Sequence, residues 1–600
     1  MTTSLAPSRR AVLKGAAIAA AAAAGSSVFR TFDEEAAAAP AHRGVFGYGV
    51  ASGDPTGDSV VIWTRATPPA HRGEPVATPG SGRGAPLRVH WQIARDRDFS
   101  RVVDQGVVVT SPRSDHTVKV DINGLNPYTR YYYRFRAAGD VSAVGRTQTA
   151  PDTRHRTHAL RFALVSCSNY TGGYFGAYRA LGKRDDLDFV LHVGDYIYEY
   201  GNGADRYGPI DLVGRRDAVP DTETIDLEGY RLRHALHKAD PDLQAAHRRH
   251  PWITIFDDHE VANNAWKSGA ENHTPGTEGA FLRRRRQAYE AYLEWMPFRL
   301  PEQQRVPHRG IRFFRRFTFG DLADLSVLET RQNRSAQIGV GPGSVPGGGF
   351  IPAGIAEVDA QLADPSRHLP EPEQLEWLKR GVEHTSRRWH LIGNQVILTP
   401  VRFPGAVFGA PADQRLLNSD QWDGYQADQT ALLSHLAAQP RRAGDAVVLT
   451  GDIHSSWAMD LPADRDGADY TPAGVEFVCP SVTSDGFYEA VRAAQPNVPA
   501  PQLVATTAQL AGAVTATNPW VRYLDGVGHG FTLIDVTPER VQADYHLTPL
   551  PTVARPDPRI DAEVEPTYAS SWQTLAGSRQ VSATTEPIGE RADHPVHRHR

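Results

Sequence analysis

Residues 189–198 read FVLHVGDYIY, and this stretch decides the fold. Its apolar run, Phe189-Val190-Leu191, has no helical periodicity and is followed through Gly194 by the polar residues Asp195 and Tyr198. A run of this length is typical of a strand buried on both faces of a sheet, although a buried helix segment can show the same pattern. Because ligands bind beyond the carboxyl ends of strands in open α/β sheets, the stretch predicts a site at such an end.

The same pattern, an apolar run followed by groups that can bind metal, occurs three more times. The runs are Phe162-Ala163-Leu164-Val165 before Cys167, Ile253-Thr254-Ile255-Phe256 before Asp257-Asp258-His259-Glu260, and Val447-Val448-Leu449 before Gly451, Asp452 and His454. Taken alone, each polar residue has an ordinary explanation, such as a buried cysteine, a core tyrosine or a helix cap. Their joint placement after four strands favours an α/β fold in which they converge on one functional site.

The bulk composition is that of a globular protein. Its 600 residues exceed the size of a single core, so we expect two domains or one large domain with additions. The formal net charge of −5 gives no nucleic-acid-specific surface. Only two cysteines occur, Cys167 and Cys479, so disulfides are not what holds the fold together.

The N-terminus has the features of an export signal. Ser8-Arg9-Arg10-Ala11-Val12-Leu13-Lys14 is a twin-arginine pattern, and the apolar stretch from Ala16 to Ala24 is too short for a membrane helix. We expect a signal peptide over residues 1–39, a mature chain that starts near Ala38 to His42, and secretion through the twin-arginine export machinery. No other span is apolar enough to cross a bilayer, so we expect an extracellular monomer without a transmembrane helix.

Residues 44–147 are predicted to form an N-terminal β-sandwich. The alternating positions are Leu87, Val89, Trp91 and Ile93 in one strand and Val118, Val120 and Ile122 in another. The segment Leu125-Asn126-Pro127, followed by Tyr131, resembles fibronectin-III-like sandwiches, in which a tyrosine hydroxyl ties a corner to the backbone. A polar linker near residues 147–158 follows this domain.

The catalytic domain is expected over residues 158–548, and residues 549–600 are expected to be a C-terminal tail or lid segment. Within the catalytic domain we predict a helix from Phe281 to Met296, ended by Pro297, with Leu282, Tyr289, Tyr292 and Leu293 facing inward. Four consecutive arginines, residues 283–286, point all around such a helix, which favours solvent or ion pairs over a phosphate site.

The chemistry of the candidate ligands predicts two different metal ions. A tyrosine binds metal at neutral pH only if a highly charged cation removes its proton, and a thiolate is a soft ligand that calcium or magnesium does not recruit. The residues that fit an Fe(III) site are Cys167, Asp195, Tyr198 and His454. The oxygen donors that fit a hard divalent cation such as Ca²⁺ are Asp258, Asn394 and Asp452, with Asp195 as a bridge. We expect the chain to turn into a helix after Gly194, which brings Asp195 and Tyr198 to one point.

Two metal ions roughly 3.5–4 Å apart can clamp the attacking and leaving oxygens of a displacement at phosphorus. A metal-bound hydroxide is then the nucleophile, and no serine is required. His259 is the candidate to hydrogen-bond the phosphoryl oxygen or the leaving alkoxide, with Glu260 orienting its ring.

These motifs carry a family resemblance. Gly194-Asp195 with Tyr198, the run Asp257-Asp258-His259-Glu260, and Gly451-Asp452 with His454 resemble the calcineurin-like metallophosphoesterases, most of all the alkaline phosphatase D (PhoD-like) family. Two further segments fit, Gly49-Val50-Ala51-Ser52-Gly53-Asp54-Pro55 and Pro480-Ser481-Val482-Thr483-Ser484. The resemblance covers about residues 47–547.

The resemblance implies a fold and an activity. The implied fold is a β-sandwich before a metallophosphoesterase domain of two packed β-sheets flanked by helices. The implied protein is a secreted alkaline phosphatase that cleaves phosphomonoesters, phosphodiesters or both at an Fe(III) and calcium centre. Carried over by position, Cys167, Asp195, Tyr198 and His454 match the iron ligands, and Asp195, Asp258, Asn394 and Asp452 match the calcium side. Glu329 stands where an aspartate is expected before Thr330-Arg331, which argues against a ligand at 329, while Arg331 is expected to contact phosphate.

Other functions stay open at this point. A phosphodiesterase of phospholipase D type would use the same residues, because loops decide whether a second ester group fits. A purple acid phosphatase with zinc or manganese beside iron is disfavoured, since such enzymes look similar but place histidine where this chain has Asp452. A secreted protein that binds phosphate or metal without catalysis is disfavoured because every expected ligand is present. A β-sandwich adhesin would explain only residues 47–145.

Overall fold

Two large β-sheets dominate the computed structural model, which describes residues 44–70, 77–299, 311–338, 349–408, 410–411, 413–440, 444–464 and 470–591. The ten-stranded sheet contains, in spatial order, β25 (Val581–Thr584), β24 (Thr567–Leu575), β23 (Arg540–Leu547), β22 (Gly530–Val536), β9 (Leu160–Val165), β10 (Phe189–His192), β11 (Pro251–Thr254), β1 (Val50–Gly53), β2 (Val60–Arg65) and β5 (Thr117–Ile122). The seven-stranded sheet contains β12 (Arg315–Phe319), β13 (Ala323–Val327), β15 (Trp389–Gly393), β18 (Asp445–Thr450), β20 (Pro472–Val478), β19 (Ser456–Pro462) and β21 (Val521–Asp525).

Two smaller sheets complete the described strands. One contains β4 (Val102–Val109), β3 (Arg88–Ala94), β6 (Arg130–Ala137) and β7 (Asp140–Val141), with β8 (Gly145–Gln148) paired to β6. The other contains β14 (Phe350–Pro352), β17 (Arg415–Asn418) and β16 (Phe403–Pro404). The helices are α1 (Gly176–Lys183), α2 (Leu227–Lys238), α3 (Pro241–Arg249), α4 (Pro275–Glu278), α5 (Phe281–Trp295), α6 (Ala356–Leu362), α7 (Pro372–His384), α8 (Gln426–Ala438), α9 (Phe487–Ala494) and α10 (Ala500–Thr517).

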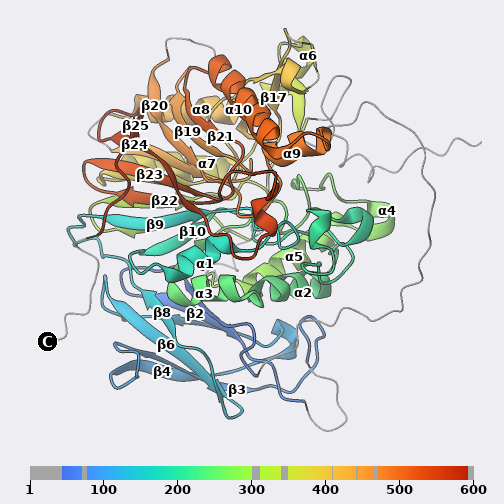
Figure 1. Cartoon of the computed structure of the whole chain (residues 1–600). Coiled ribbons are helices and arrows are strands. Elements are labelled where there is room, and N and C mark those ends of the chain that lie inside the picture. Colours follow the sequence, from blue (N-terminus) through green and yellow to red (C-terminus); the bar gives the residue numbers. More distant parts are fainter. Residues whose placement is uncertain are drawn as a thin grey trace, which may run out of the picture.

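The two large sheets pack face to face and share one core. Leu164 and Leu191 of the ten-stranded sheet lie in the same buried cluster as Val447 and Phe477 of the seven-stranded sheet. Helices α1, α3 and α5 cover the outer face of the first sheet, and α7 and α8 cover that of the second (Figure 1). Strands buried on both faces need apolar residues at every position, which explains their uninterrupted apolar runs.

The predicted strands are confirmed with one change. The runs at 162–165, 189–191 and 447–449 lie in β9, β10 and β18, whereas the third run leaves its strand at Thr254. Strands β9, β10 and β11 are parallel neighbours, but β18 belongs to the other sheet. The four runs therefore converge from two packed sheets.

The N-terminal region is not separate from the catalytic sheet. Strand β1 pairs in parallel with β11, so β1, β2 and β5 extend the ten-stranded sheet. A sandwich core does form between these strands and β3 and β6. At its corner the Asn126 backbone N–H donates to the Tyr131 hydroxyl at 2.8 Å, as expected from the sequence, while the fibronectin-III-like type remains a prediction.

Two other expectations need correction. Residues 549–600 were expected to be a tail or lid, but β24 and β25 continue the ten-stranded sheet beside β23, because their backbones complete its hydrogen bonding. Helix α5 ends at Trp295, one residue before the predicted end at Met296, and Leu282 is 56% exposed instead of facing inward. The predicted export signal at residues 1–39 lies outside the described residues. Within the described ranges, no helix has the length and apolar character that a bilayer crossing needs.

Candidate metal centre

The site lies where strands of both large sheets end. Cys167 follows β9, Asp195 follows β10, and Asp257 to His259 follow β11. From the seven-stranded sheet, Arg331 follows β13, Asn394 follows β15, and Asp452 and His454 follow β18. The carboxyl ends of the parallel strands of both large sheets therefore meet at one place, which is where ligands bind in such sheets.

Four of these residues have left-handed backbones. The φ angles are 59° for Cys167, 57° for Asp195, 61° for Asp452 and 55° for His454. Residues with side chains adopt this region at a cost of order 1–3 kcal/mol each, and such strain concentrates at functional sites. The sharp turn at Asp195, and not the expected helix, brings Tyr198 back toward the strand end.

Glu260 holds the turn that carries Asp195. Its carboxylate accepts hydrogen bonds from the backbone N–H groups of Tyr196 at 2.6 Å, Asp257 at 2.8 Å and Asp195 at 3.2 Å. The expectation that Glu260 orients His259 is therefore wrong. Glu260 therefore stabilises the turns after β10 and β11 together.

The first group of ligands gathers around Asp195. Ligand atoms of Cys167, Asp195 and His454 all lie within 4.8 Å of one another. The Tyr198 hydroxyl lies 2.9 Å from Asp195 Oδ2 and 3.4 Å from His454 Nε2. The structure thus brings together the four residues predicted as iron ligands.

The tautomer of His454 suits a metal ligand. Its Nδ1–H donates to the carbonyl oxygen of Asp485 at 2.6 Å, which leaves Nε2 unprotonated and turned toward Tyr198. A backbone carbonyl that fixes one ring nitrogen in this way is common behind metal-binding histidines.

The second group of ligands is made of carboxylates. Oxygen atoms of Asp195, Asp257, Asp258 and Asp452 lie within 4.8 Å of one another. Burial raises the pKa of Asp195 well above its usual value and that of Asp452 to about 7. The Oδ1 atom of Asp258 is buried without a hydrogen bond. Crowded carboxylates and an unbonded buried oxygen fit cations, so both groups pass the test for metal binding.

Arg331 partly neutralises the carboxylates. Its Nη1 donates to both oxygens of Asp420, at 2.9 and 3.1 Å, and its Nη2 donates to Asp257 at 3.2 Å and Asp452 at 3.0 Å. Its Nε also donates to Asp257. All five N–H groups are thus engaged, and the side chain is 1% exposed. The expected contact with phosphate is not what the structure shows, because carboxylates occupy the whole guanidinium.

Glu329 and Asn394 both form hydrogen bonds to neighbouring protein groups. Glu329 Oε1 accepts from the backbone N–H groups of Arg331 and Gln332, which shapes the turn that carries Arg331. This agrees with the expectation that position 329 is not a ligand. The Asn394 side chain donates to the Val396 carbonyl at 2.5 Å, and its Oδ1 accepts from Trp422 at 3.3 Å. A role for Asn394 as a calcium ligand stays a prediction.

His259 is oriented by a residue that the sequence did not suggest. Its Nδ1 lies 2.7 Å from Glu199 Oε2, and its ring lies 4.3 Å from the ring of Tyr198. Burial opposes the charged form, but Glu199, Asp258 and Asp195 together raise the pKa of His259 well above its usual value. Among the described residues, none hydrogen-bonds Nε2, which is therefore the nitrogen available to a ligand.

The segment Ser481–Asp485 brackets the first ligand group. Ser484 Oγ lies 2.9 Å from the Cys167 carbonyl oxygen and 2.6 Å from the Tyr198 hydroxyl. Arg559 secures this segment by donating to the Thr483 carbonyl at 2.8 Å and to Asp485 Oδ1 at 2.7 Å. The motif at 480–484 pointed to Ser484, whereas nothing in the sequence singled out Arg559.

Comparison with known proteins agrees with this geometry. Residues 162–545 match the family model described as PhoD-like phosphatase, and residues 33–151 match its N-terminal domain. The chain belongs to the PhoD-like phosphatase family. It is therefore a phosphoric ester hydrolase, which confirms the enzyme class expected from the sequence.

Two relatives support the family assignment of this PhoD-like phosphatase. Alkaline phosphatase D of Bacillus subtilis (strain 168) is 34% identical over 546 residues, which span 90% of this chain and 83% of that protein. The solved structure described as "Structure of PhoD" is 30% identical, with a TM-score of 0.73 over 92% of this chain and 94% of that chain.

Proposed function

We propose that this PhoD-like phosphatase is an exported alkaline phosphatase that hydrolyses phosphate esters at an Fe(III) and calcium centre. The observation that carries the proposal is the position of Asp195, which belongs both to the group with Cys167 and His454 and to the group with Asp258 and Asp452. A residue shared in this way suits a ligand that bridges two ions.

The donor sets support two different ions. Cys167, Tyr198 and His454 supply sulfur, phenol oxygen and nitrogen, which suit iron, and Asp258 and Asp452 supply hard carboxylate oxygens, which suit calcium. Asn394 completes the proposed calcium side. When bound, such ions lower the pKa of water and offset charge on phosphoryl oxygens.

The protein residues position and protonate the substrate. Glu199 fixes the His259 ring, so that Nε2–H donates to a phosphoryl oxygen or to the leaving oxygen. As a water oxygen bonds to phosphorus, the bond between phosphorus and the leaving oxygen breaks and the proton on Nε2 moves to that leaving oxygen, so the products are an alcohol and phosphate. The proton that the water gives up restores the protonated state of His259. Arg331 acts indirectly as a positioning residue, because it holds the carboxylates of Asp257 and Asp452 in place.

Two matched substitutions separate the proposed ions. We expect Cys167→Ser to lower iron content and weaken the visible charge-transfer band while calcium stays bound. We expect Asp258→Asn to lower calcium content while the colour remains. Cys479→Ser is the control, because this second cysteine is also fully buried but lies in the hydrophobic core, where Ser166 Oγ is the hydrogen-bond partner of its Sγ at 3.4 Å. Colourless wild-type protein of full activity would disprove the iron assignment.

Substrate preference is tested with matched aryl phosphate monoesters and diesters, with and without a calcium chelator. We expect activity to fall when the chelator removes calcium. A much higher kcat/KM for the diester would favour the alternative, a phosphodiesterase of phospholipase D type that uses the same residues.

We also propose secretion through the twin-arginine pathway as a monomer. The arginine pair at Arg9 and Arg10 and the short alanine-rich stretch support export. Replacement of both arginines by lysine is expected to retain the precursor inside the cell, and export of this variant at the normal level would refute the route.

A further inference from the structure

A second polar cavity lies at the far end of the seven-stranded sheet from the metal centre. Its volume is about 480 Å³, and it opens between the β12–β13 hairpin and the C-terminal end of α7. Asp324 is the second residue of β13, and Arg387 precedes β15, whereas Arg331 and Asn394 follow those same strands at the metal centre. The cavity and the metal centre therefore lie at opposite edges of one sheet.

Positive charge dominates the lining of this cavity. Three guanidinium groups, from Arg316, Arg380 and Arg387, line it together with the imidazole of His384, and Asp324 is the one carboxylate among the lining residues. In the described part of the chain, the guanidinium groups of Arg380 and Arg387 form no ion pair. The lining therefore carries a formal excess of two positive charges before His384 is counted.

Arg316 is held in place before any ligand arrives. Its Nε donates to Ser326 Oγ at 2.9 Å, its Nη2 donates to the Trp377 carbonyl at 3.3 Å, and its guanidinium lies 4.5 Å from the Trp377 ring. A Cβ at position 381 would collide with the guanidinium, so a larger residue there would displace Arg316. A fixed guanidinium loses little entropy when it binds an anion.

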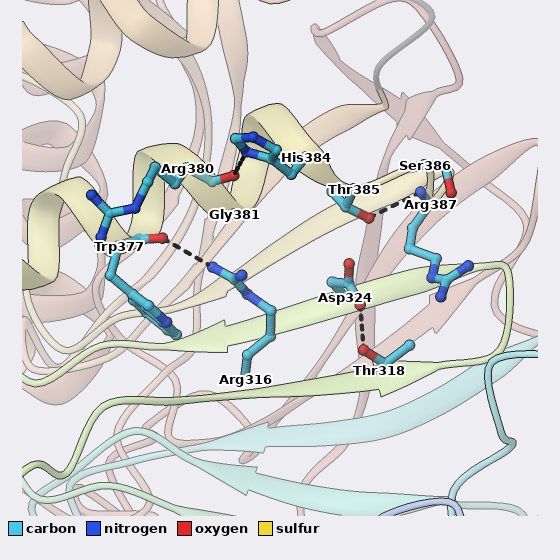
Figure 2. Close-up of a pocket in the computed structure, with 10 residues that line it drawn as sticks. All are labelled: Arg316, Thr318, Asp324, Trp377, Arg380, Gly381, His384, Thr385, Ser386 and Arg387. Carbon is cyan, nitrogen blue, oxygen red and sulfur yellow. Dashed lines mark hydrogen bonds between the residues drawn. The ribbon is translucent and has the colours of Figure 1, made fainter.

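Figure 2 shows Arg316 and Arg387 on the two sides of Asp324, with Arg380 extending from α7 beyond Arg316. Arg316 rises from its strand toward α7, and Arg387 descends on the other side of Asp324. The Thr318 hydroxyl donates to Asp324 Oδ1 at 2.6 Å, so this carboxylate already has a neutral partner. The arginines are left with donors for an external anion.

We propose that this cavity binds a phosphoryl group, supplied either by orthophosphate, which the enzyme releases, or by a phosphate ester. Arginine pairs with tetrahedral phosphate oxygens through two parallel N–H donors, and this geometry is stronger than a neutral hydrogen bond. The competing explanation is that the cations only face the partial negative charge of the α7 carbonyls. That explanation requires no ligand and predicts no binding.

Equilibrium dialysis of the holoenzyme with radiolabelled orthophosphate tests the proposal. We expect two phosphate equivalents per wild-type chain, one at the metal centre and one at the cavity. In the double variant Arg380→Gln and Arg387→Gln, we expect the cavity affinity to fall at least about tenfold while kcat is unchanged. The matched control is Arg88→Gln with Arg136→Gln, two exposed arginines of β3 and β6.

A second arm uses methylphosphonate, a monoester-like anion that the enzyme cannot hydrolyse. Displacement of cavity-bound phosphate by methylphosphonate supports a site that also accepts substrate, and failure to displace it supports a site for the product. If the double variant binds as many phosphate equivalents as the wild type, with unchanged affinities, the proposal is overturned. This comparison holds whichever metals occupy the catalytic centre, because both proteins are prepared with the same metals.

Discussion

Ser484→Ala should weaken iron binding through the loss of a single oxygen atom. Ser484 Oγ lies 2.6 Å from the Tyr198 hydroxyl, and a metal-bound phenolate at that position would accept a hydrogen bond from it. The other neighbour of Ser484, the Cys167 carbonyl, also accepts from the Thr483 backbone N–H at 3.3 Å. Removal of the hydroxyl therefore leaves the carbonyl bonded and removes support from the phenolate.

The size of the effect follows from the charge of the acceptor. A hydrogen bond to a charged group contributes about 1.5–3 kcal/mol, which corresponds to roughly a 10- to 150-fold loss of iron affinity. Without the donor, the phenolate charge is less stabilised, so the charge-transfer band should move to lower energy.

The assay measures iron retained against a graded series of chelator concentrations, together with the visible spectrum. The control is Ser455→Ala, because Ser455 is equally buried and its hydroxyl bonds the Ile453 carbonyl and the Trp457 ring instead. If Ser484→Ala kept both the affinity and the band position of the control, Ser484 would not support a metal-bound phenolate.

Three further predictions concern the surroundings of the site. Arg331→Lys keeps the positive charge but leaves three hydrogen-bond donors instead of five, so we expect a lower kcat with little change in KM. A raised KM at normal kcat would instead indicate that this side chain contacts the phosphate. Burial lowers the pKa of His192 to about 3, and its Nδ1 accepts from the Gly194 N–H at 3.3 Å. The unfolded chain, with a pKa of about 6.5, then binds the extra proton, so stability should fall by about 1.4 kcal/mol per pH unit as the pH drops from about 6.5 toward 3. His192→Gln should flatten the pH dependence of the thermal midpoint, and an unchanged slope would refute this. Arg559→Gln breaks buried ion pairs, which costs about 3–5 kcal/mol of folding free energy, so both the thermal midpoint and iron retention should fall. Iron retention equal to that of the wild type would show that Arg559 has no effect on the ligands.

The sequence predicted the parts of the fold that depend on local pattern. Apolar runs identified β9, β10 and β18 because strands buried on both faces have little tolerance for polar residues. The alternation at 87–93 identified β3 because one of its faces is exposed. Neither pattern carries information about which strands pair, so the assignment of β18 to a second sheet, and of β1 to the catalytic sheet, came only from the structure.

The same limit applies to the site. Residues that follow a strand within a few positions, such as Cys167 and Asp195, were found because sequence adjacency places them at a sheet edge. Glu199 follows Tyr198 directly, but its pairing with His259 is a tertiary contact, and so is the position of Arg559. A single sequence contains no signal for such contacts. The role of Glu260 was misjudged for a related reason, since the left-handed turn at Asp195 exposes backbone N–H groups that need a buried acceptor.

The supports of the two ligand groups are separate, and Asp195 joins them. On the proposed iron side, Ser484 and Arg559 hold the segment that contacts Cys167 and Tyr198. On the proposed calcium side, Arg331 bonds the carboxylates. Substitutions within one support should therefore lower the content of mainly one ion. A substitution of Asp195 should lower the content of both ions, because Asp195 alone belongs to every ligand group among the described residues. A substitution of Glu260 should do the same, because its carboxylate fixes the turn that carries Asp195.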